Sequence, residues 1–269
     1  MNLHTLPRTF YFTRHGQSEY NLLGKIGGDS GLSSNGEEYA RRLAKFAKEK
    51  IGTKTTIVDG KEVTTNVPAR LWTSTLLRTK ETAKYIEHNE FEATWDNGDT
   101  SNWLQFRQNE RRNLDELYAG LCDGMTYKEI EQMYPAEFEA RQEDKLAYRY
   151  ARGESYMDVT LRLEPLAHDL ERTREPLLIV AHQGILRILY SYFMGLSRAE
   201  APYVKIPLNH VIIVTPHAYG CHEERVCLMP KEEMFCDGQD EPVTSMPEKK
   251  KLAVAAVVEE DPIMDAPSC

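Results

Sequence analysis

The sequence predicts an α/β fold built on a mainly parallel central sheet. Short apolar strands alternate along the chain with capped, amphipathic helices, which is the pattern of such folds. Residues 177–181 form the continuous apolar run Leu-Leu-Ile-Val-Ala, typical of a strand that is buried on both faces. Cationic and histidine side chains follow three of the predicted strands, as expected at the carboxyl edge of an α/β sheet, where ligands bind.

The size and composition are those of a soluble globular protein. The 269 residues have room for one large domain or two small ones, with 41% hydrophobic and 28% charged residues. No apolar stretch reaches the roughly 20 residues that span a bilayer, and the N-terminal segment lacks the apolar core of a signal peptide. Five cysteines without a Cys-x-x-Cys pair make a zinc site or a disulfide framework unexpected. A cytoplasmic protein is expected.

The net charge of −9 disfavours broad binding to nucleic acid, which needs a basic surface. A small phosphorylated molecule remains a candidate, because local clusters of cations decide its binding rather than the global charge. No metal or cofactor is expected. The sequence names no protein partner.

The first half of the chain contains two predicted strands, two helices and a hairpin. Ser34 to Glu37 resembles a capping box that opens a helix, whose apolar face is Tyr39, Leu43, Phe46 and Ala47. The dipeptide Asp59-Gly60 predicts a two-residue hairpin turn. The polar segment after the second helix is interpreted as a surface excursion. The predicted ranges are 9–13 (strand), 34–50 (helix), 55–65 (hairpin), 69–73 (strand), 75–88 (helix) and 89–111 (excursion).

The second half is dominated by helices. Thr126 caps one helix, Pro135 occupies the first position of the next, and Ser155 caps a third that runs to about Arg174. Strand 177–181 is followed by a helix that ends near Gly195, and strand 211–214 is the last clear central strand. A Pro-rich, charged segment over 229–269 is predicted to be a disordered tail that follows a domain over 1–228.

The most informative passage is Arg14-His15-Gly16, which directly follows the first strand. A neighbouring cation disfavours imidazolium, so it keeps the ring neutral and nucleophilic. The guanidinium group of Arg14 can donate two hydrogen bonds to phosphate oxygens in a bidentate arrangement. The tripeptide alone is weak, because a histidine at a strand end is usually a cap.

Partners for His15 occur at two other predicted strand ends. Arg78 lies in the first turn of a helix, and His182 directly follows the buried strand. Charge stabilisation and positioning dominate the catalysis of phosphoryl transfer, so a cluster of these groups suits that reaction. Glu116 is a candidate proton donor, with Asp115 as its rival and a plain surface carboxylate as the ordinary alternative.

A second anion site is indicated by pairs four residues apart on predicted helices, Arg141 with Lys145 and Gln183 with Arg187. Tyr127 and Tyr156 stand at helix starts, which suit anions. The alternative for Arg141 and Lys145 is that they lie on a solvated helix surface and bind no anion. The set of six donors indicates a substrate with two phosphates.

These residues resemble the histidine phosphatase superfamily, which has the phosphoglycerate mutase-like fold, and within it the fructose-2,6-bisphosphatases. The similar stretches cover nearly all of residues 9–228 and include RHGQSEYN (14–21), GKIGGDSGLSSNG (24–36), LDELYAGLCDGMTYKEI (114–130), YPAEFEARQEDKLAYRYARGESY (134–156) and LIVAHQGILRILYSYF (178–193). The resemblance implies a three-layer α/β/α fold. It also implies hydrolysis of the 2-phosphate of fructose 2,6-bisphosphate, without a metal or cofactor.

The resemblance further implies roles for individual residues. His15 would become phosphohistidine, and Glu116 would donate the proton. The transferring phosphoryl group would be held by Arg14, Asn21, Arg78 and His182. Fructose and its 6-phosphate would be bound by Gly27, Tyr127, Arg141, Lys145, Tyr156, Gln183 and Arg187.

Two segments, near 52–68 and 89–111, are insertions relative to the family, and the second leads into Glu116, so it is expected near the mouth of the site. No Gly-x-x-x-x-Gly-Lys-Ser/Thr loop occurs, so no kinase half is expected. A broader sugar-phosphate phosphatase or mutase is the alternative within the family. A non-catalytic adaptor is the alternative outside enzymes.

Overall fold

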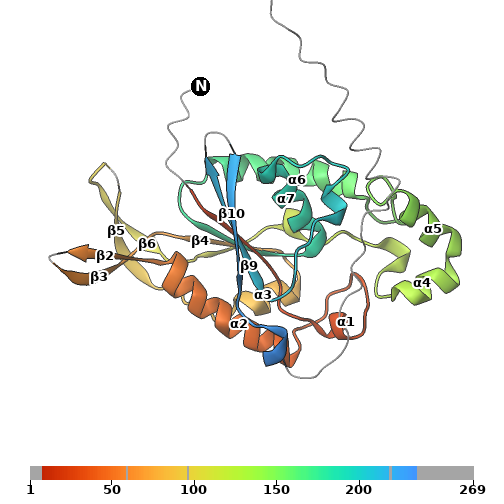
Figure 1. Ribbon diagram of the computed structural model, residues 1–269, viewed down its shortest axis with the longest axis horizontal. Coiled ribbons are helices and arrows are strands. Elements are labelled where there is room, and N and C mark those ends of the chain that lie inside the picture. Colours follow the sequence, from red (N-terminus) through yellow and green to blue (C-terminus); the bar gives the residue numbers. More distant parts are fainter. Residues whose placement is uncertain (1–7, 59, 96, 218–219, 235–269) are drawn as a thin grey trace, which may run out of the picture.

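The computed structural model describes residues 8–58, 60–95, 97–217 and 220–234, and its centre is a six-stranded sheet in the order β10-β9-β1-β8-β4-β7 (Figure 1). The neighbours β1, β8, β4 and β7 are parallel, whereas β9 and β10 run antiparallel. The predicted, mainly parallel α/β sheet is therefore confirmed. Its strands are β1 (Phe10–Arg14), β4 (Arg70–Thr73), β7 (Gln108–Glu110), β8 (Leu177–Ala181), β9 (His210–His217) and β10 (Gly220–Cys227).

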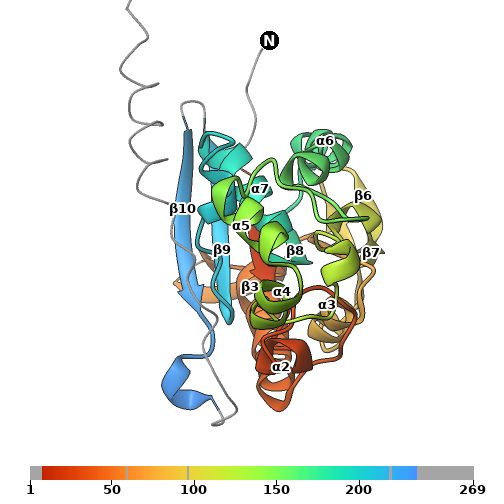
Figure 2. The same ribbon diagram turned by 90° about the vertical axis from the view of Figure 1, so that its right-hand side faces the viewer.

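Helices cover both faces of this sheet and give the expected three layers (Figures 1 and 2). Alternate residues of β8 enter two hydrophobic clusters, with Ile179 among the α6 and α7 side chains and Val180 among those of α2 and α3. All five residues of β8 are buried, as its apolar run predicts. The covering helices are α2 (Ser34–Phe46), α3 (Leu77–Ala83), α6 (Tyr156–Arg172) and α7 (Gln183–Met194).

Three short helices, α1 (Glu19–Leu22), α4 (Tyr127–Met133) and α5 (Pro135–Glu143), gather at one end of the molecule (Figure 1). Thr126 and Ser155 cap α4 and α6 as predicted, and Pro135 opens α5. Gly195 ends α7 in the left-handed conformation that favours glycine. Single 3₁₀ turns lie at Arg112–Leu114, Gly120–Cys122, Ala201–Tyr203 and Lys231–Glu233.

Helix α2 begins at residue 34 as predicted, but its capping residue and the bounds of α3 differ from the prediction. The N-cap of α2 is Ser33 rather than Ser34, because the extended Ser33 accepts a hydrogen bond from the Gly36 N–H. The helix then continues through one π-helical turn, Ala47–Ile51. Helix α3 is shorter than 75–88, because the Thr75 N–H and hydroxyl bind Asp115 and the backbone is still extended at Leu76.

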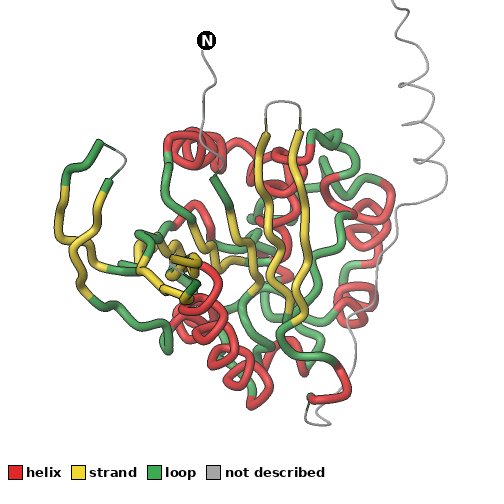
Figure 3. The backbone as a smooth tube through the Cα atoms, turned by 60° about the vertical axis from the view of Figure 1, so that its left-hand side comes forward, coloured by secondary structure: helices red, strands yellow, loops and turns green. Residues whose placement is uncertain are grey.

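Both segments predicted to be insertions contain hairpins. Strands β2 (Thr53–Val58) and β3 (Lys61–Asn66) pair as the sequence predicts, although Asp59 of the turn lies outside the described residues. The segment interpreted as an excursion contains a second hairpin, β5 (Glu90–Thr94) with β6 (Thr100–Leu104), before β7 joins the central sheet. Figures 1 and 3 place both hairpins beside the sheet, at the end away from α1, α4 and α5. The β5–β6 hairpin therefore lies away from those helices, and the part of segment 89–111 that leads into Glu116 is its last strand, β7.

The chain beyond β10 remains in contact with the core as far as it is described. Met229 is only 2% exposed and packs in the α2 and α3 cluster, and Arg42 of α2 donates to the Leu228 carbonyl oxygen. Residues 235–269, most of the predicted tail, lie outside the described residues. Among the helices that are described, none is both long and apolar enough to cross a lipid bilayer.

Candidate active site

Three neighbouring parallel strands deliver polar side chains to one edge of the sheet. In the sheet register Arg14 of β1 stands opposite Ala181 of β8, and Thr73 of β4 stands opposite Val180. The residues that follow these strands are therefore adjacent, and the rings of His15 and His182 lie 5.2 Å apart between centroids. His182 is fully buried, and His15, Arg14 and Arg78 are each 4% exposed. The predicted meeting of these four residues is confirmed.

The hydrogen bond of His15 determines which ring nitrogen can react. Its Nδ1 lies 2.7 Å from the carbonyl oxygen of Gly16, which can only accept, so Nδ1 carries the proton. The Nε2 lone pair of the neutral ring is then available to attack an electrophile. Burial, together with the positive charges of Arg78 and Arg14, holds the pKa of His15 well below its usual value. The ring is therefore neutral and nucleophilic at neutral pH.

A chain of hydroxyl groups positions His182. Its Nε2 lies 2.7 Å from Ser74 Oγ, which lies 2.8 Å from Thr79 Oγ1, and that hydroxyl donates to the Leu76 carbonyl oxygen at 2.8 Å. Because the chain ends at a carbonyl, each hydroxyl donates onward and His182 donates from Nε2. Its Nδ1 is buried without a hydrogen-bond partner among the described residues, so this atom remains to bind a ligand. Burial and Arg78 lower the pKa of His182 as well.

Backbone carbonyl groups anchor the two arginines. Arg14 Nη1 donates to the Ile206 carbonyl oxygen at 3.2 Å, and Arg78 Nη1 donates to that of Gly28 at 2.7 Å. Both guanidinium groups act electrostatically on His15 and His182. Two buried cations beside two neutral rings make a site that attracts a dianion such as a phosphoryl group.

The structure separates the two candidate carboxylates by their partners. Asp115 accepts hydrogen bonds from the Thr75 N–H and hydroxyl at 2.7 to 2.8 Å. These bonds connect the loop after β4 to the chain after β7. Glu116 instead accepts from the N–H of Gly184, two residues after His182, at 3.2 Å. Arg162 of α6 fixes this loop by donating to the Asp115 carbonyl oxygen at 2.7 Å. Glu116 is therefore the carboxylate beside the histidine pair.

Two further predicted site residues, Asn21 and Gly27, lie in the segment that follows β1. Asn21 belongs to α1, where its amide oxygen accepts from the Ser18 N–H at 3.0 Å and so caps the helix. Gly27 has a φ of +69°, and a Cβ there would meet an Asp123 carboxylate oxygen at 1.8 Å, so glycine is required. That carboxylate accepts from the Gly28 N–H. The loop thus approaches Arg78, while contact of Asn21 or Gly27 with a substrate stays a prediction.

A second buried cationic cluster contains Arg141, Lys145 and Arg187, which are 8%, 5% and 9% exposed. Arg141 donates to the hydroxyl oxygens of Tyr150 and Tyr127, and Arg187 donates to that of Tyr156. The burial excludes the alternative of a solvated surface. Helix α5 ends at Glu143, so the prediction that Lys145 shares a helix face with Arg141 is wrong, although the chain still brings the two cations close enough to interact. Burial and the charges of the two arginines lower the pKa of Lys145 to about 6.

The two clusters lie on either side of the start of α7. A Cβ on Gly184 would meet Glu116 Oε1 at 2.6 Å and the Tyr156 hydroxyl oxygen at 3.7 Å, so glycine allows both to approach. Gln183 is the first residue of this helix. Four supporting residues were not predicted, because they carry no motif signal in the sequence: Ser74, Thr79, Tyr150 and Arg162.

We expect the two buried histidines to make the fold sensitive to acid. Unfolding releases them to a pKa near 6.5, above their folded values, so the unfolded state binds more protons as the pH falls below about 6.5. Each ring then removes up to about 1.4 kcal/mol of stability per pH unit. Urea unfolding at several pH values from 8 to 5 measures this slope. The double variant His15→Gln/His182→Gln should have the shallower slope, and equal slopes would contradict the assignment.

Comparison with known proteins agrees with this geometry. The family model of the histidine phosphatase superfamily (branch 1) matches residues 10–228. The chain is 44% identical over 220 residues to the fructose-2,6-bisphosphatase of Saccharomyces cerevisiae, covering 82% of this chain and 42% of that protein. It is 42% identical over 228 residues to 6-phosphofructo-2-kinase/fructose-2,6-bisphosphatase 3 of Rattus norvegicus, covering 85% of this chain and 35% of that protein. The chain thus spans less than half the length of these relatives.

A solved structure extends the likeness to the fold. The alpha-ribazole phosphatase of Shigella flexneri superimposes with a TM-score of 0.63 at 16% identity, covering 81% of this chain and 96% of that one. The expected phosphoglycerate mutase-like fold is thereby confirmed. With a matching family model over most of its length and a histidine pair near two buried arginines, this chain belongs to the histidine phosphatase superfamily.

Proposed function

We propose that the chain hydrolyses the 2-phosphate of fructose 2,6-bisphosphate to fructose 6-phosphate and phosphate. The observation that carries this proposal is the second buried cluster, Arg141, Lys145 and Arg187, which a phosphatase for monophosphates does not need. The names of the yeast and rat relatives support the same substrate. A sugar bisphosphate would place one phosphate at each cluster.

In the first step His15 Nε2 attacks the phosphorus and the bond from phosphorus to the oxygen on C2 of fructose breaks. The Glu116 carboxyl group protonates that leaving oxygen, so fructose 6-phosphate departs neutral at C2. Arg14 and Arg78 hold the phosphoryl oxygens as their charge redistributes, with Asn21 as a further donor, and His182 donates from Nδ1 once the bound dianion favours its imidazolium form. In the second step Glu116 removes a proton from water, which attacks phosphohistidine and releases phosphate.

The sugar and its 6-phosphate would occupy the second cluster. Arg141 and Arg187 are already oriented by tyrosine hydroxyl groups, so they lose little freedom on binding. Lys145 adds a point charge to the two planar guanidinium groups. The proposed contacts are Tyr127, Arg141, Lys145, Tyr156, Gln183, Arg187 and the backbone of Gly27.

We also propose that the protein works in the cytoplasm on this small metabolite. The thiols of Cys122, Cys221 and Cys227 are free, which suits a reducing compartment.

A turnover panel tests the substrate. Fructose 2,6-bisphosphate should give the highest kcat/KM among phosphorylated sugars, and 3-phosphoglycerate should be a poor substrate and should not be isomerised. Equal rates for assorted monophosphates would favour the broader phosphatase, and isomerisation would favour the mutase. No turnover of any of these would favour an adaptor.

Lys145 provides a prediction on proton linkage. A lysine with a pKa of about 6 is mostly neutral at pH 8, and a bound 6-phosphate raises that pKa, so substrate binding takes up close to one proton. Calorimetry of the His15→Asn variant in buffers of different ionisation enthalpy measures this uptake. Lys145→Met should abolish it and raise KM by about 10- to 100-fold with little loss of kcat. Uptake that persists in Lys145→Met would contradict the assignment.

A further inference from the structure

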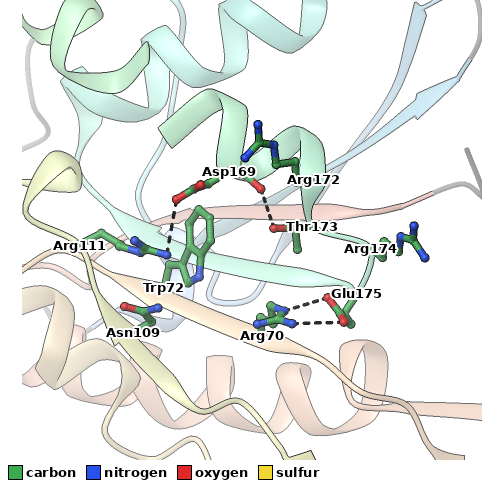
Figure 4. Close-up of a pocket in the computed structure, with 9 residues that line it drawn as sticks. All are labelled: Arg70, Trp72, Asn109, Arg111, Asp169, Arg172, Thr173, Arg174 and Glu175. Carbon is green, nitrogen blue, oxygen red and sulfur yellow. Dashed lines mark hydrogen bonds and ion pairs between the residues drawn. The ribbon is translucent and has the colours of Figure 1, made fainter. Parts of the chain in front are cut away.

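A separate cationic cavity of about 340 Å³ lies between the edge of the central sheet and the carboxyl-terminal end of α6 (Figure 4). None of its lining residues belongs to the catalytic or sugar-binding groups described above. Four arginines surround it with only two carboxylates, although the chain as a whole carries a net charge of −9. The charged lining residues are Arg70, Arg111, Asp169, Arg172, Arg174 and Glu175.

The ion pairs of the cavity leave an excess of positive charge. Arg70 donates from two nitrogens to both carboxylate oxygens of Glu175, at 2.8 and 3.2 Å, which satisfies that pair (Figure 4). Asp169 lies 3.6 Å from Arg111. Within the described ranges no carboxylate pairs with Arg172 or Arg174, so two guanidinium charges remain uncompensated at the rim.

Arg111 is held against the wall of the cavity with a donor to spare. Its guanidinium carbon lies over the ring of Trp72, 4.8 Å from the centroid, and Trp72 is 4% exposed, so a cation–π contact holds the group against the ring. Its Nε is buried and has no hydrogen-bond partner in the described part of the chain. The side chain as a whole is 34% exposed, so other parts of the guanidinium group are open to an anion in the cavity.

We propose that this cavity binds a small phosphate-bearing molecule, in addition to the substrate. Arginines from β4, from the chain after β7 and from the end of α6 line it, and guanidinium groups match the geometry of phosphate oxygens better than any other side chain. The volume admits a phosphorylated metabolite of a few carbon atoms and excludes a folded macromolecule. The carbonyl oxygen of Asp169 in the last turn of α6 is already bonded to Thr173, so it does not oppose the anion as a free acceptor.

The cavity adjoins the segment that carries Glu116. Arg111 accepts a hydrogen bond at its carbonyl oxygen from the Leu114 N–H at 2.9 Å, within the 3₁₀ turn that leads to Glu116. Arg162 ties the same segment to α6, the helix that supplies Asp169 and Arg172. An anion bound at Arg111 therefore acts on the segment that carries Glu116, and we expect the resulting shift of this segment to lower kcat. This second part depends on the proposed function, whereas binding itself does not.

Titration with inorganic phosphate tests the binding, with the fluorescence of Trp72 as the signal. The background is Trp95→Phe/Trp103→Phe, which leaves Trp72 as the single tryptophan. The titration is repeated with the further substitution Arg78→Met, which removes phosphate binding beside His15. Sodium chloride at matched ionic strength controls for screening, and citrate tests whether carboxylates serve as well as phosphate.

A saturable change should persist in Arg78→Met, and Arg172→Gln/Arg174→Gln should weaken it by about tenfold or more. The matched double variant Arg112→Gln/Arg198→Gln loses the same charge at exposed positions outside the cavity and should bind normally. A change that vanishes in Arg78→Met would assign the signal to the catalytic site. Equal weakening by both double variants, or no saturable change, would overturn the proposal.

The effect on catalysis is measured as kcat at saturating substrate, where phosphate no longer competes for the catalytic site. Phosphate should lower kcat by about twofold or more in the unsubstituted protein and leave kcat unchanged in Arg172→Gln/Arg174→Gln. Saturable binding without this change in kcat would refute the coupling while leaving the site in place.

Discussion

Replacement of His15 by Asn is expected to reduce the hydrolysis of fructose 2,6-bisphosphate by about 10⁴-fold or more, because the amide has no nucleophilic nitrogen. Asn can still donate to the Gly16 carbonyl oxygen, so the loop should keep its shape. Substrate binding should survive, since the proposed 6-phosphate contacts are unchanged. Steady-state turnover and calorimetric binding measure the two effects separately.

His210 offers a matched control for this substitution. Its Nδ1 also lies within hydrogen-bonding distance of a backbone carbonyl oxygen, that of Leu208, at 2.8 Å, and it stands at the start of β9 rather than in the catalytic cluster. His210→Asn should therefore keep nearly full activity. A His15→Asn protein with substantial activity, or a His210→Asn protein that is folded and inactive, would contradict the role given to His15.

Substitution Glu116→Gln is expected to lower kcat by about 10²- to 10⁴-fold with little change in KM. The amide has nearly the same shape, and its oxygen can still accept from the Gly184 N–H, but it cannot transfer a proton. Steady-state turnover of folded protein over a range of substrate concentrations measures both parameters.

The neighbouring carboxylate separates chemistry from structure. Asp115→Asn removes an acceptor from the Thr75 hydroxyl and N–H, so it should lower thermal stability while leaving most of kcat intact. If Asp115→Asn reduced kcat more than Glu116→Gln in folded protein, the two residues would have to exchange roles.

The fold was predictable where one physical signal dominated. The apolar run of β8 specified a buried parallel strand, and the polar residues after β1 and β8 followed from the way parallel strands end at one edge. The strands β7 and β10 escaped prediction, because β7 is a polar three-residue edge strand and β10 is largely exposed. Such strands form because their neighbours offer free backbone groups rather than because of their own side chains.

The site was predictable in its reactive groups but not in their supports. Residue types at three predicted strand ends indicated that His15, His182 and the two arginines would lie close together. The choice of Glu116 over Asp115 rested on resemblance until the Thr75 hydrogen bonds were visible. Ser74 and Thr79 are ordinary hydroxyl residues in sequence, and only the folded chain aligns them with His182 Nε2. Roles that depend on a third partner cannot be derived from spacing.

The most direct test is a rapid acid-free quench of the protein mixed with fructose 2,6-bisphosphate that carries radioactive phosphorus at the 2-position. The account predicts an acid-labile, base-stable label that forms faster than turnover and maps to the peptide containing His15. Multiple turnovers without any label on the protein, or a label on a residue other than His15, would contradict it.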